Sequence, residues 1–379
     1  MKKICVVTSS RAEYGIMSNL INKISLDSEL ELQLIVTGTH LSKKFGYTCS
    51  EITSPITKKI DIEIEQKPVR AMSVAAEKFY DAFCELKPDV LLILGDRYEI
   101  MAVAVAAILN NLPIAHICGG ESTEGAIDEA VRHSVTKMSH LHFVSCEEYR
   151  NRVIQLGENP DRVFNVGSLN VENIEKVRLL SKKELEERLK FEFGRKNLLV
   201  TFHPVTLEDD TAFRQTRELL SALSELEDTK IIFTKPNSDE GNDEIFRLID
   251  DYVLSHGNAV AFTSMGMLSY LSALQFVDAV AGNSSSGIIE APSFKIGTIN
   301  IGDRQRGRVR AESVTDCECR KKDILEAVKK MYSPEFREML KNVVNVYSQN
   351  NTSDRIINVL KIVDAKKLLK KKFYNLEIK

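Results

Sequence analysis

The 379-residue sequence predicts an α/β protein built from two Rossmann-like domains, each with a doubly wound parallel sheet. Two observations lead to this prediction. Short apolar, β-branched runs alternate with longer helical patterns along the chain, and the runs VLLIL and VDAVAG are apolar throughout instead of at every second position. Continuous apolarity is typical of strands that helices cover on both faces. The length also exceeds the usual size of a single hydrophobic core.

The first half of the chain follows the order βαβα. Strands are expected in KKICVVTSS, ELQLIVTG, DVLLILGD, PIAHICGG and LHFVSC, and helices over residues 14–25, 73–86, 98–109 and 127–138. The pattern breaks near residue 165, where Gly and Asn follow a strand and the highly charged helix SKKELEERLK begins. Such a break indicates a domain boundary, so we predict a first domain over residues 1–166.

The second half repeats the alternation. Strands are expected in NLLVTFHP, KIIFTKPN, NAVAFT and FVDAVAGN, with helices over residues 209–226, 242–255 and 265–274, and GIIEAP and KIGTINIG then follow. We predict a second domain over residues 167–353. The remaining residues, 354–379, contain a final helix over about 354–371 that could cross back to the first domain.

Composition narrows the classes of partner. The chain has 51 Lys and Arg against 54 Asp and Glu, a net charge of −3, which argues against nucleic acid. No stretch approaches the roughly 20 apolar residues that span a bilayer, so we expect a soluble protein without a membrane partner. Seven Cys without CxxC spacing indicate neither a disulfide framework nor a zinc site, and a reducing cytoplasm fits best.

Polar residues gather where the predicted strands end. Parallel sheets bind ligands at the carboxyl ends of their strands, so these positions are the candidates for chemistry. They supply Arg, His and carboxylate side chains, which suit an anionic substrate and acid–base catalysis. The ends concerned are Thr8 to Arg11, Gly95 to Arg97, His116 to Glu121, His203, Asn283 to Ser286, and Asp303 with Arg304.

The segment GNSSSGIIEAP, residues 282–292, follows a predicted strand and opens a predicted helix. Small residues there allow backbone amides and hydroxyls to approach a ligand, and the helix N-terminus carries partial positive charge, as a diphosphate site requires. Glu290 lies four residues after Ser286, one turn into the helix, where it could accept two ribose hydroxyls. An ordinary Ser-rich helix cap, with Glu290 favouring the helix dipole, explains the same pattern.

Two common nucleotide motifs are missing from the sequence. No GxGxxG follows the first strand, which argues against nicotinamide chemistry, and no P-loop pattern occurs, which argues against nucleoside triphosphate hydrolysis. A nucleotide sugar is the anion that remains.

Six motifs, in order, resemble those of hydrolysing UDP-N-acetylglucosamine 2-epimerases: SSRAEYG, LGDRYEI, HICGGESTEGAIDEAVRHSVTKMSHLHF, RVIQLGENPDRVFNVGSLN, FHPVTLE and GNSSSGIIEAP with INIGDRQRGRVR. The resemblance spans nearly the whole chain. It implies the GT-B architecture, with two Rossmann-like domains facing a cleft, and a homodimer. The implied reaction eliminates UDP to leave a glycal and then hydrates it, giving N-acetylmannosamine for sialic acid biosynthesis, with no cofactor and no metal.

The resemblance also implies roles for individual residues. Asp96 and Asp128 match the carboxylates that transfer protons, and Glu121 is a third candidate. Arg132, one helical turn after Asp128, could steady that carboxylate or the substrate. His203 matches the histidine facing the diphosphate, where it stabilises charge or protonates the leaving UDP. The remaining matches are contacts to nucleotide, phosphate or ribose: Arg11, Arg97, Arg304, Ser284, Ser285 and Glu290.

Structural explanations exist for several of these residues. Asp96 and Arg97 could form an ion pair that closes a strand, and His203 could be a loop histidine with satisfied hydrogen bonds. We assign structural roles to His116, His140 and His142, which lie in or beside apolar strands where hydrogen-bonded core histidines are common.

One position departs from the family pattern. Several relatives have a catalytic glutamate directly before the Gly-Gly pair, where this chain has Cys118. Either Glu121 takes over that work, or the substrate is a different sugar, such as a UDP-2,4-diacetamido-2,4,6-trideoxyhexose of the legionaminic acid pathway. Three other activities stay open: a non-hydrolysing epimerase, a GT-B glycosyltransferase, and a sensor that binds a UDP-sugar without turnover.

Overall fold

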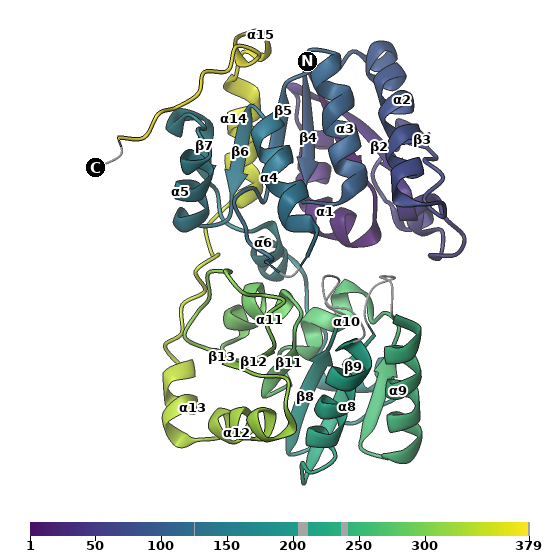
Figure 1. The fold of residues 1–379 in the computed structure, drawn as a ribbon, viewed down its shortest axis with the longest axis vertical. Coiled ribbons are helices and arrows are strands. Elements are labelled where there is room, and N and C mark those ends of the chain that lie inside the picture. The colour runs from purple at the N-terminus through teal and green to yellow at the C-terminus, as the bar shows by residue number, and fades with distance from the viewer. Residues whose placement is uncertain (125, 204–210, 236–241, 378–379) are drawn as a thin grey trace. The chain divides into compact units, whose positions relative to one another are not determined.

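The computed structural model describes residues 1–124, 126–203, 211–235 and 242–377, and the chain forms two compact units (Figure 1). Unit 1 comprises Met1–Glu121, Asp128–Asn173 and Tyr347–Lys379, and unit 2 comprises Ser122–Ile127 and Ile174–Val346. Each unit contains one wholly parallel sheet with helices on both faces. The predicted doubly wound fold is therefore confirmed. The predicted bounds of 1–166, 167–353 and 354–379 stay a prediction about separate folding domains.

Unit 1 contains a seven-stranded sheet in the order β3-β2-β1-β4-β5-β6-β7. Its strands are β1 (Lys2–Thr8), β2 (Leu30–Thr37), β3 (Lys58–Ile60), β4 (Val90–Leu94), β5 (Ile114–Ile117), β6 (Leu141–Val144) and β7 (Val163–Asn165). Its α-helices are α1 (Arg11–Leu26), α2 (Pro68–Leu86), α3 (Tyr98–Leu109), α4 (Asp128–Met138), α5 (Glu147–Gln155), α14 (Thr352–Ile362) and α15 (Ala365–Leu368), and α6 (Leu169–Lys176) leads into unit 2.

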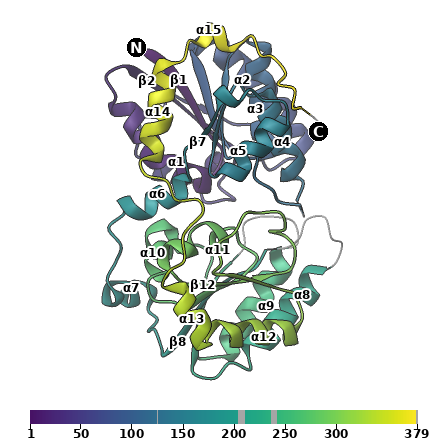
Figure 2. The ribbon, with the colours of Figure 1, turned by 90° about the vertical axis from the view of Figure 1, so that its left-hand side faces the viewer.

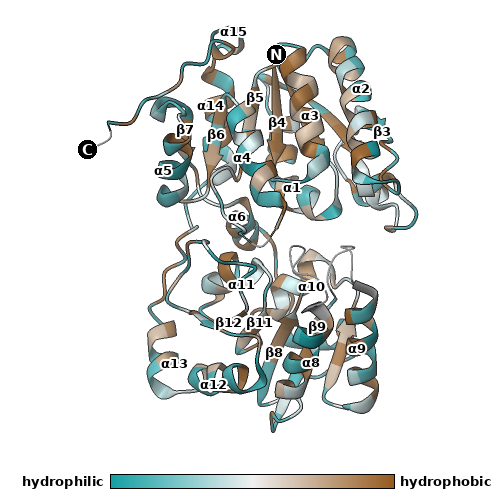
Figure 3. Ribbon diagram, viewed as in Figure 1, coloured by the Kyte–Doolittle hydropathy of each residue, from teal (hydrophilic) through white to brown (hydrophobic). Residues whose placement is uncertain are grey.

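Each face of this sheet has its own hydrophobic core. Successive residues of β4 alternate between the two cores, since Leu92 packs with α1 and α14 whereas Leu91 and Ile93 pack with α2, α3 and α4. All five residues of β4 are buried, as the continuous run VLLIL predicts. Figure 3 shows β4, and β8 of unit 2, in the brown of apolar sequence.

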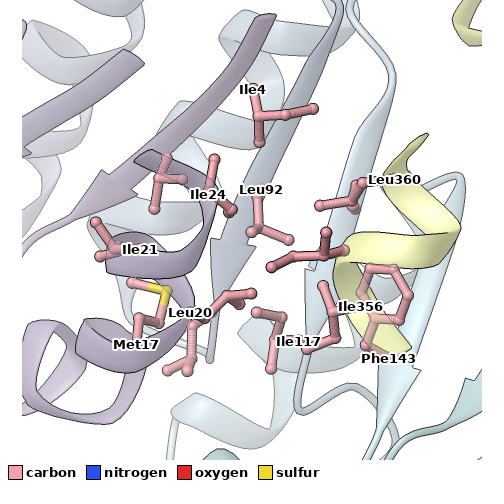
Figure 4. Close-up of a cluster of buried hydrophobic side chains, with 14 of the residues drawn as sticks. Ile4, Met17, Leu20, Ile21, Ile24, Leu92, Ile117, Phe143, Ile356 and Leu360 are labelled. Carbon is pink, nitrogen blue, oxygen red and sulfur yellow. The ribbon is translucent and has the colours of Figure 1, made fainter. Parts of the chain in front are cut away.

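The C-terminal helix α14 packs beside α1 on one face of the unit 1 sheet (Figure 2). Ile356 and Leu360 are fully buried and join the side chains of α1 and the central strands (Figure 4). Lys2, the first residue of β1, donates its ammonium hydrogens to the carbonyls of Leu360, Lys361 and Val363, each at 2.7 Å. A cation at the C-terminus of a helix satisfies its last carbonyls and opposes the helix dipole.

Unit 2 contains a six-stranded sheet in the order β10-β9-β8-β11-β12-β13. Its strands are β8 (Lys196–Thr201), β9 (Thr229–Thr234), β10 (Ala259–Phe262), β11 (Ala279–Gly282), β12 (Gly297–Ile301) and β13 (Val314–Cys317). Its α-helices are α7 (Lys182–Leu189), α8 (Thr211–Leu223), α9 (Asn242–Ser255), α10 (Gly266–Ala273), α11 (Ser286–Ile289), α12 (Lys321–Met331) and α13 (Pro334–Leu340). Helices α8, α9, α12 and α13 cover one face, and α7 and α10 cover the other.

The structure corrects the predicted final helix. Instead of one helix over about 354–371, α14 ends at Ile362 and a short helix, α15, follows. Val363 adopts an extended conformation, and the Asp364 carboxylate accepts from the backbone amides of Lys366 and Lys367, which starts the new helix. In the described parts of the chain, no helix is long and apolar enough to cross a membrane.

Two edge strands, β3 and β13, were not predicted. Both are short, and Lys or Asp interrupts their apolar pattern. Edge strands pair on one side alone and need less apolar sequence than central strands, so periodicity detects them poorly.

Replacement of Ile356 by Ala should destabilise unit 1 by about 2–5 kcal/mol, because the change leaves a cavity in a fully packed core. Ile362 on the same helix is 82% exposed, so Ile362→Ala should change stability by less than about 0.5 kcal/mol. Urea unfolding followed by circular dichroism measures both. Equal losses in the two variants would contradict the packing of α14 against the sheet.

Candidate active site

The strand order of unit 1 reverses between β1 and β4. From β1 the chain builds outward through β2 and β3, then returns to place β4 on the other side of β1. Loops after the two central strands therefore leave in opposite directions and open a crevice, which is where doubly wound sheets bind ligands. Arg11 follows β1, and Asp96 and Arg97 follow β4, so three predicted site residues lie at this switch point.

Unit 2 repeats the same topology. Its order reverses between β8 and β11, and His203 follows β8 whereas Ser284 and Ser285 follow β11. Arg304 follows the next strand, β12. The switch point of each unit thus carries predicted site residues.

Asp96 is held by a buried arginine. Arg132, on α4, is 1% exposed, and its Nε donates to Asp96 Oδ2 at 3.0 Å while its Nη2 also contacts this oxygen. Its Nη1 donates to Glu129 Oε2 at 2.8 Å and to the Glu121 carbonyl at 3.1 Å. Arg132 is thus engaged by three acceptors within unit 1, whereas the Asp96 side chain keeps 28% of its surface exposed. The arrangement orients one partly accessible carboxylate at the end of β4.

The loop after β5 positions Glu121. Gly120 has φ +78°, and a Cβ there would lie 2.5 Å from the Tyr149 carbonyl on α5, so a larger residue cannot occupy the position without moving the backbone. Arg152 Nη1 donates to the Gly120 carbonyl at 2.6 Å. Glu121 is 6% exposed and accepts from Ser145 Oγ at 3.4 Å. Cys118, at the start of this loop, also has positive φ, at 67°.

The other predicted residues of unit 1 lie at helix N-termini. Asp128 is the first residue of α4 and is half-buried, and Arg11 is the first residue of α1 and is exposed. Arg97 precedes α3, and its Nε donates to Glu99 Oε1 at 2.6 Å. Burial alone would lower the pKa of Arg97, but Glu99 and Glu13 raise it above its usual value. Arg97 is therefore a permanent cation with 36% of its side chain exposed.

Asn283 joins the two central strand ends of unit 2. Its Oδ1 accepts from the His203 amide at 2.6 Å and its Nδ2 donates to the His203 carbonyl at 2.8 Å. Its own carbonyl accepts from Arg304 Nη1 at 3.1 Å and from Gln305 Nε2 at 2.9 Å. Gly282 makes this approach possible, because a Cβ there would lie 1.9 Å from the Thr201 carbonyl. Asn283 thus positions His203 through its side-chain amide and Arg304 through its backbone carbonyl.

His203 is neutral near neutral pH. Burial and, to a smaller extent, the charge of Arg304 lower its pKa to about 3. Its Nδ1 is buried and has no hydrogen-bond partner among the described residues. The rest of the FHPVTLE motif, residues 204–208, lies outside the described part of the chain.

The Ser-rich segment differs from its predicted form. Helix α11 has only four residues and is followed by a 3-10 turn, Ala291–Phe294, so Glu290 lies at the end of α11 and not one turn into a long helix. The dipole of so short a helix is weak, because few peptide units add to it. Ser284, Ser285 and Glu290 are all half-buried, and Ser284 Oγ accepts from the Ser286 amide at 3.4 Å.

The three histidines expected to be structural make hydrogen bonds inside unit 1. His116 Nε2 contacts the Gly95 carbonyl at 2.8 Å, which anchors the loop that carries Asp96. His140 Nδ1 accepts from the Ile114 amide, and His142 Nε2 contacts Glu158 Oε2 at 3.0 Å.

Four residues at the two switch points received no individual role from the sequence, although Ser9 and Asn283 lie in the predicted strand-end segments 8–11 and 283–286. Ser9, Glu13 and Glu99 form a buried cluster with Arg97, and Asn283 joins the ends of β8 and β11. Each lies within one of the motifs SSRAEYG, LGDRYEI and GNSSSGIIEAP. A buried carboxylate next to an arginine in the first turn of a helix was the available signal, but it also fits an ordinary helix start.

Comparison with known proteins identifies the family. The family description "UDP-N-acetylglucosamine 2-epimerase" matches residues 22–361. The chain belongs to this family. It is 43% identical to the GDP/UDP-N,N'-diacetylbacillosamine 2-epimerase (hydrolyzing) of Campylobacter jejuni, over 99% of both chains. It is 40% identical to the polysialic acid biosynthesis protein P7 of Escherichia coli, over 99% of this chain and 98% of that protein.

Solved structures of UDP-N-acetylglucosamine 2-epimerases share the fold. The putative enzyme of Listeria monocytogenes has a TM-score of 0.83 at 16% identity, over 95% of this chain and 96% of that chain. The Neisseria meningitidis enzyme, solved with UDP-GlcNAc bound, has a TM-score of 0.80 at 19% identity, over 94% and 99%. The GT-B fold class is therefore confirmed, and the chain is an enzyme, a UDP-sugar 2-epimerase of the hydrolysing kind.

The epimerase should lose stability as the pH falls below about 6.5. Burial lowers the pKa of His40, His116 and His140 to about 4 and that of His203 to about 3. Below about pH 6.5 these imidazoles therefore bind protons in the unfolded chain but stay neutral in the folded chain, so the free energy of unfolding decreases. Melting temperatures measured between about pH 7 and pH 5 test this, and His203→Gln should weaken the dependence. A stability that stays constant over this range would contradict the burial of these imidazoles.

Proposed function

We propose that the enzyme hydrolyses UDP-2,4-diacetamido-2,4,6-trideoxyglucose, which is UDP-N,N'-diacetylbacillosamine, to UDP and 2,4-diacetamido-2,4,6-trideoxymannose. The observation that carries this choice is the 43% identity, over 99% of both chains, to the Campylobacter jejuni protein that is named for the GDP- or UDP-linked form of this sugar. A Legionella pneumophila protein named for the same activity is 32% identical over 96% of both chains. We further propose a role in making a nine-carbon sugar acid of the legionaminic acid type.

The reaction we propose has two stages. In the first, a carboxylate removes the proton at C2 of the sugar, the bond between C1 and the diphosphate oxygen breaks, and UDP leaves with the electron pair. In the second, water adds its hydroxyl to C1 of the resulting glycal and a proton returns to C2 on the opposite face. The enzyme must therefore supply carboxylates for proton transfer and cations for the departing diphosphate.

We assign the proton transfers to the switch point of unit 1. Asp96 is the first choice, because Arg132 fixes its orientation while part of the carboxylate stays accessible. Glu121 and Asp128 complete the set, and in this assignment Arg132 acts through Asp96 without touching the sugar. Arg11 and Arg97 bind the phosphate or nucleotide. Glu121 then does the work that relatives give to the residue at the position of Cys118.

We assign the leaving group to the switch point of unit 2. Arg304 supplies positive charge, and His203, which is neutral and lacks a described partner at Nδ1, offers a hydrogen bond to the diphosphate. A neutral imidazole cannot release a proton as readily as an imidazolium, so in this proposal His203 stabilises charge instead of protonating UDP. Ser284, Ser285 and Glu290 contact the phosphate and ribose.

The second candidate substrate is UDP-N-acetylglucosamine, with N-acetylmannosamine as product and sialic acid as the final sugar. The Escherichia coli polysialic acid protein, at 40% identity, and a Neisseria meningitidis serogroup B protein named UDP-N-acetylglucosamine 2-epimerase, at 32% over 88% of both chains, favour it. The two substrates differ at C4 and C6 of the sugar, away from the reacting carbons.

Incubation of the enzyme with each UDP-sugar in deuterated water, followed by NMR, tests the proposal. Deuterium at C2 of a free manno sugar, together with free UDP, is the expected result. A higher kcat/KM for the diacetamido sugar supports the first substrate, and a higher value for UDP-N-acetylglucosamine favours the second. Retention of UDP on the sugar would mean a non-hydrolysing epimerase, and turnover that depends on an added acceptor would mean a glycosyltransferase.

Asp96→Asn and Asp128→Asn should each lower kcat by about 10²–10⁴-fold, because an amide cannot accept the C2 proton or deliver one to the glycal. UDP binding, measured by calorimetry, should stay within a few-fold of the native enzyme. Glu51→Gln, an exposed change in unit 1, is the matched control and should leave turnover unchanged. Normal turnover in both aspartate variants would remove them from the catalytic assignment.

We also propose that the enzyme is a cytoplasmic homodimer, with helix α3 in the subunit interface. After Tyr98 and Glu99 in the first turn, its sequence IMAVAVAAIL is wholly apolar, and Val105, Ile108 and Leu109 are 37%, 40% and 66% exposed. A helix that is hydrophobic all round is normally buried. Light scattering should give twice the 42.7 kDa chain mass for the native protein and a single chain mass for Ile108→Glu. A native monomer would contradict this proposal.

A further inference from the structure

A pair of buried glutamates lies at the switch point of unit 1. Glu13 is in the first turn of α1, just after β1, and Glu99 is in the first turn of α3, just after β4. Glu13 is 6% exposed and Glu99 is fully buried. Two carboxylates are expensive to bury together unless their charge is compensated. The reaction proposed above uses neither of them.

Ser9 connects the two carboxyl groups. Its Oγ lies 3.0 Å from both oxygens of Glu13 and 2.9 Å from Glu99 Oε1. The Ser9 amide donates to Glu13 Oε2 at 2.7 Å. On the other side, Arg97 Nε donates to the same oxygen of Glu99 that faces Ser9, at 2.6 Å. The contacts therefore form an unbroken chain from Glu13 through Ser9 and Glu99 to Arg97.

The number of hydrogens available for these contacts determines the net charge of the four side chains. A serine hydroxyl has one hydrogen, so Ser9 cannot donate to two ionised carboxylates at once. With one proton on Glu13 Oε1, each carboxyl group makes a hydrogen bond with Ser9, because Glu13 Oε1 donates to Ser9 Oγ and Ser9 Oγ donates to Glu99 Oε1, while Glu13 Oε2 accepts from the Ser9 amide. The remaining negative charge, on Glu99, then balances the positive charge of Arg97. With both carboxylates ionised, one contact of Ser9 is repulsive and the cluster carries an excess negative charge.

We propose that Glu13 and Glu99 share one proton through Ser9, and that they act as positioning residues that hold Arg97 in place for the phosphate of the substrate. The part of this inference that concerns the substrate rests on the proposed function. The shared proton itself is a property of the enzyme without substrate.

The charged groups around Glu13 favour this protonation state. The pKa of Glu13 is raised to about 7, because burial and the charge of Glu99 outweigh the lowering by Arg97 and by the hydrogen bonds from Ser9. Tyr98 also lies on the α3 side, and it is neutral because burial raises its pKa above the usual value.

The other groups near the start of α1 are Arg11 and His40. Arg11 is exposed at the first position of the helix, and burial lowers the pKa of His40 to about 4, so this imidazole is neutral. Neither group offers Glu13 a buried positive charge that would oppose its protonation at neutral pH.

The pair therefore makes substrate binding depend on pH. Below about pH 7 the chain of hydrogen bonds is complete and Arg97 balances one carboxylate. Above about pH 7 Glu13 loses its proton, and Arg97 then faces two negative charges that compete with the phosphate for it. KM should rise at alkaline pH, whereas kcat should change little, because the proton-transfer groups are elsewhere.

Infrared spectroscopy of the enzyme without substrate tests the shared proton directly. The wild-type protein should show the band of a buried, protonated carboxyl group near pH 6, and the band should disappear as the pH rises through about 7 to 9. Glu13→Gln and Glu99→Gln should each remove this band, and Glu51→Gln, at an exposed glutamate of unit 1, should keep it. Absence of the band in the wild-type protein near pH 6 would overturn the proposal whatever the enzyme's substrate is.

Kinetics test the positioning role. Glutamine at position 13 can donate to Ser9 at every pH and so imitates the protonated form. Above pH 7 the wild-type kcat/KM should fall about tenfold per pH unit because KM rises. The Glu13→Gln enzyme should not show this fall. Glu99→Gln should raise KM about tenfold or more at every pH, because Arg97 loses its partner.

An unchanged fall of kcat/KM at alkaline pH in a folded Glu13→Gln enzyme would refute the positioning role. Failure of every UDP-sugar to react would refute the proposed function instead, and the infrared result would still stand.

Discussion

The pairing of β1 with β4, and of β8 with β11, is the constraint on which the rest of the structure depends. In each unit the chain leaves these two parallel strands in opposite directions, so the residues after them lie together at the carboxyl edge of the sheet, where doubly wound folds bind ligands. The pairing is close enough in unit 2 that position 282 must be glycine, since a Cβ would collide with the Thr201 carbonyl. The same backbone contact lets Asn283 reach His203 and Arg304.

Two charged pairs form at the strand ends of unit 1. Arg132 is buried with Asp96, and Glu99 is buried with Arg97. A buried charge without a partner would be costly, so each pair stabilises the loop that carries it only while both members are present. In both pairs one member is almost fully buried while the other keeps part of its surface exposed. This asymmetry gives the exposed member a fixed orientation and leaves it available to a ligand.

Family membership and geometry contribute different parts of the functional picture. The relatives identify an enzyme that acts on a UDP-sugar at C2. The geometry gives the state of individual groups: the Asp96 carboxylate is oriented by Arg132 and keeps part of its surface accessible, His203 is neutral, and Arg132 is buried. The choice between sugars depends on groups at C4 and C6, which the proton-transfer residues do not contact in the reaction we propose. A change of substrate within the family therefore requires no change in the chemistry at C1 and C2.

The sequence by itself determined the fold class, because continuous apolar strands such as β4 need helices on both faces. The composition of each strand is enough to show this requirement. It also located Asp96, His203 and Ser284 at strand ends, since position along an alternating pattern is a local property. Only the tertiary structure decided that α14 packs on α1, that α11 is a single turn, and that the buried residues Ser9, Glu13 and Glu99 form one cluster with the partly exposed Arg97. The hydrogen bond from Ser9 to Glu99 joins the residues after β1 to those after β4, about 90 positions apart in the sequence. A local sequence pattern cannot predict which distant residue will contact a buried carboxylate.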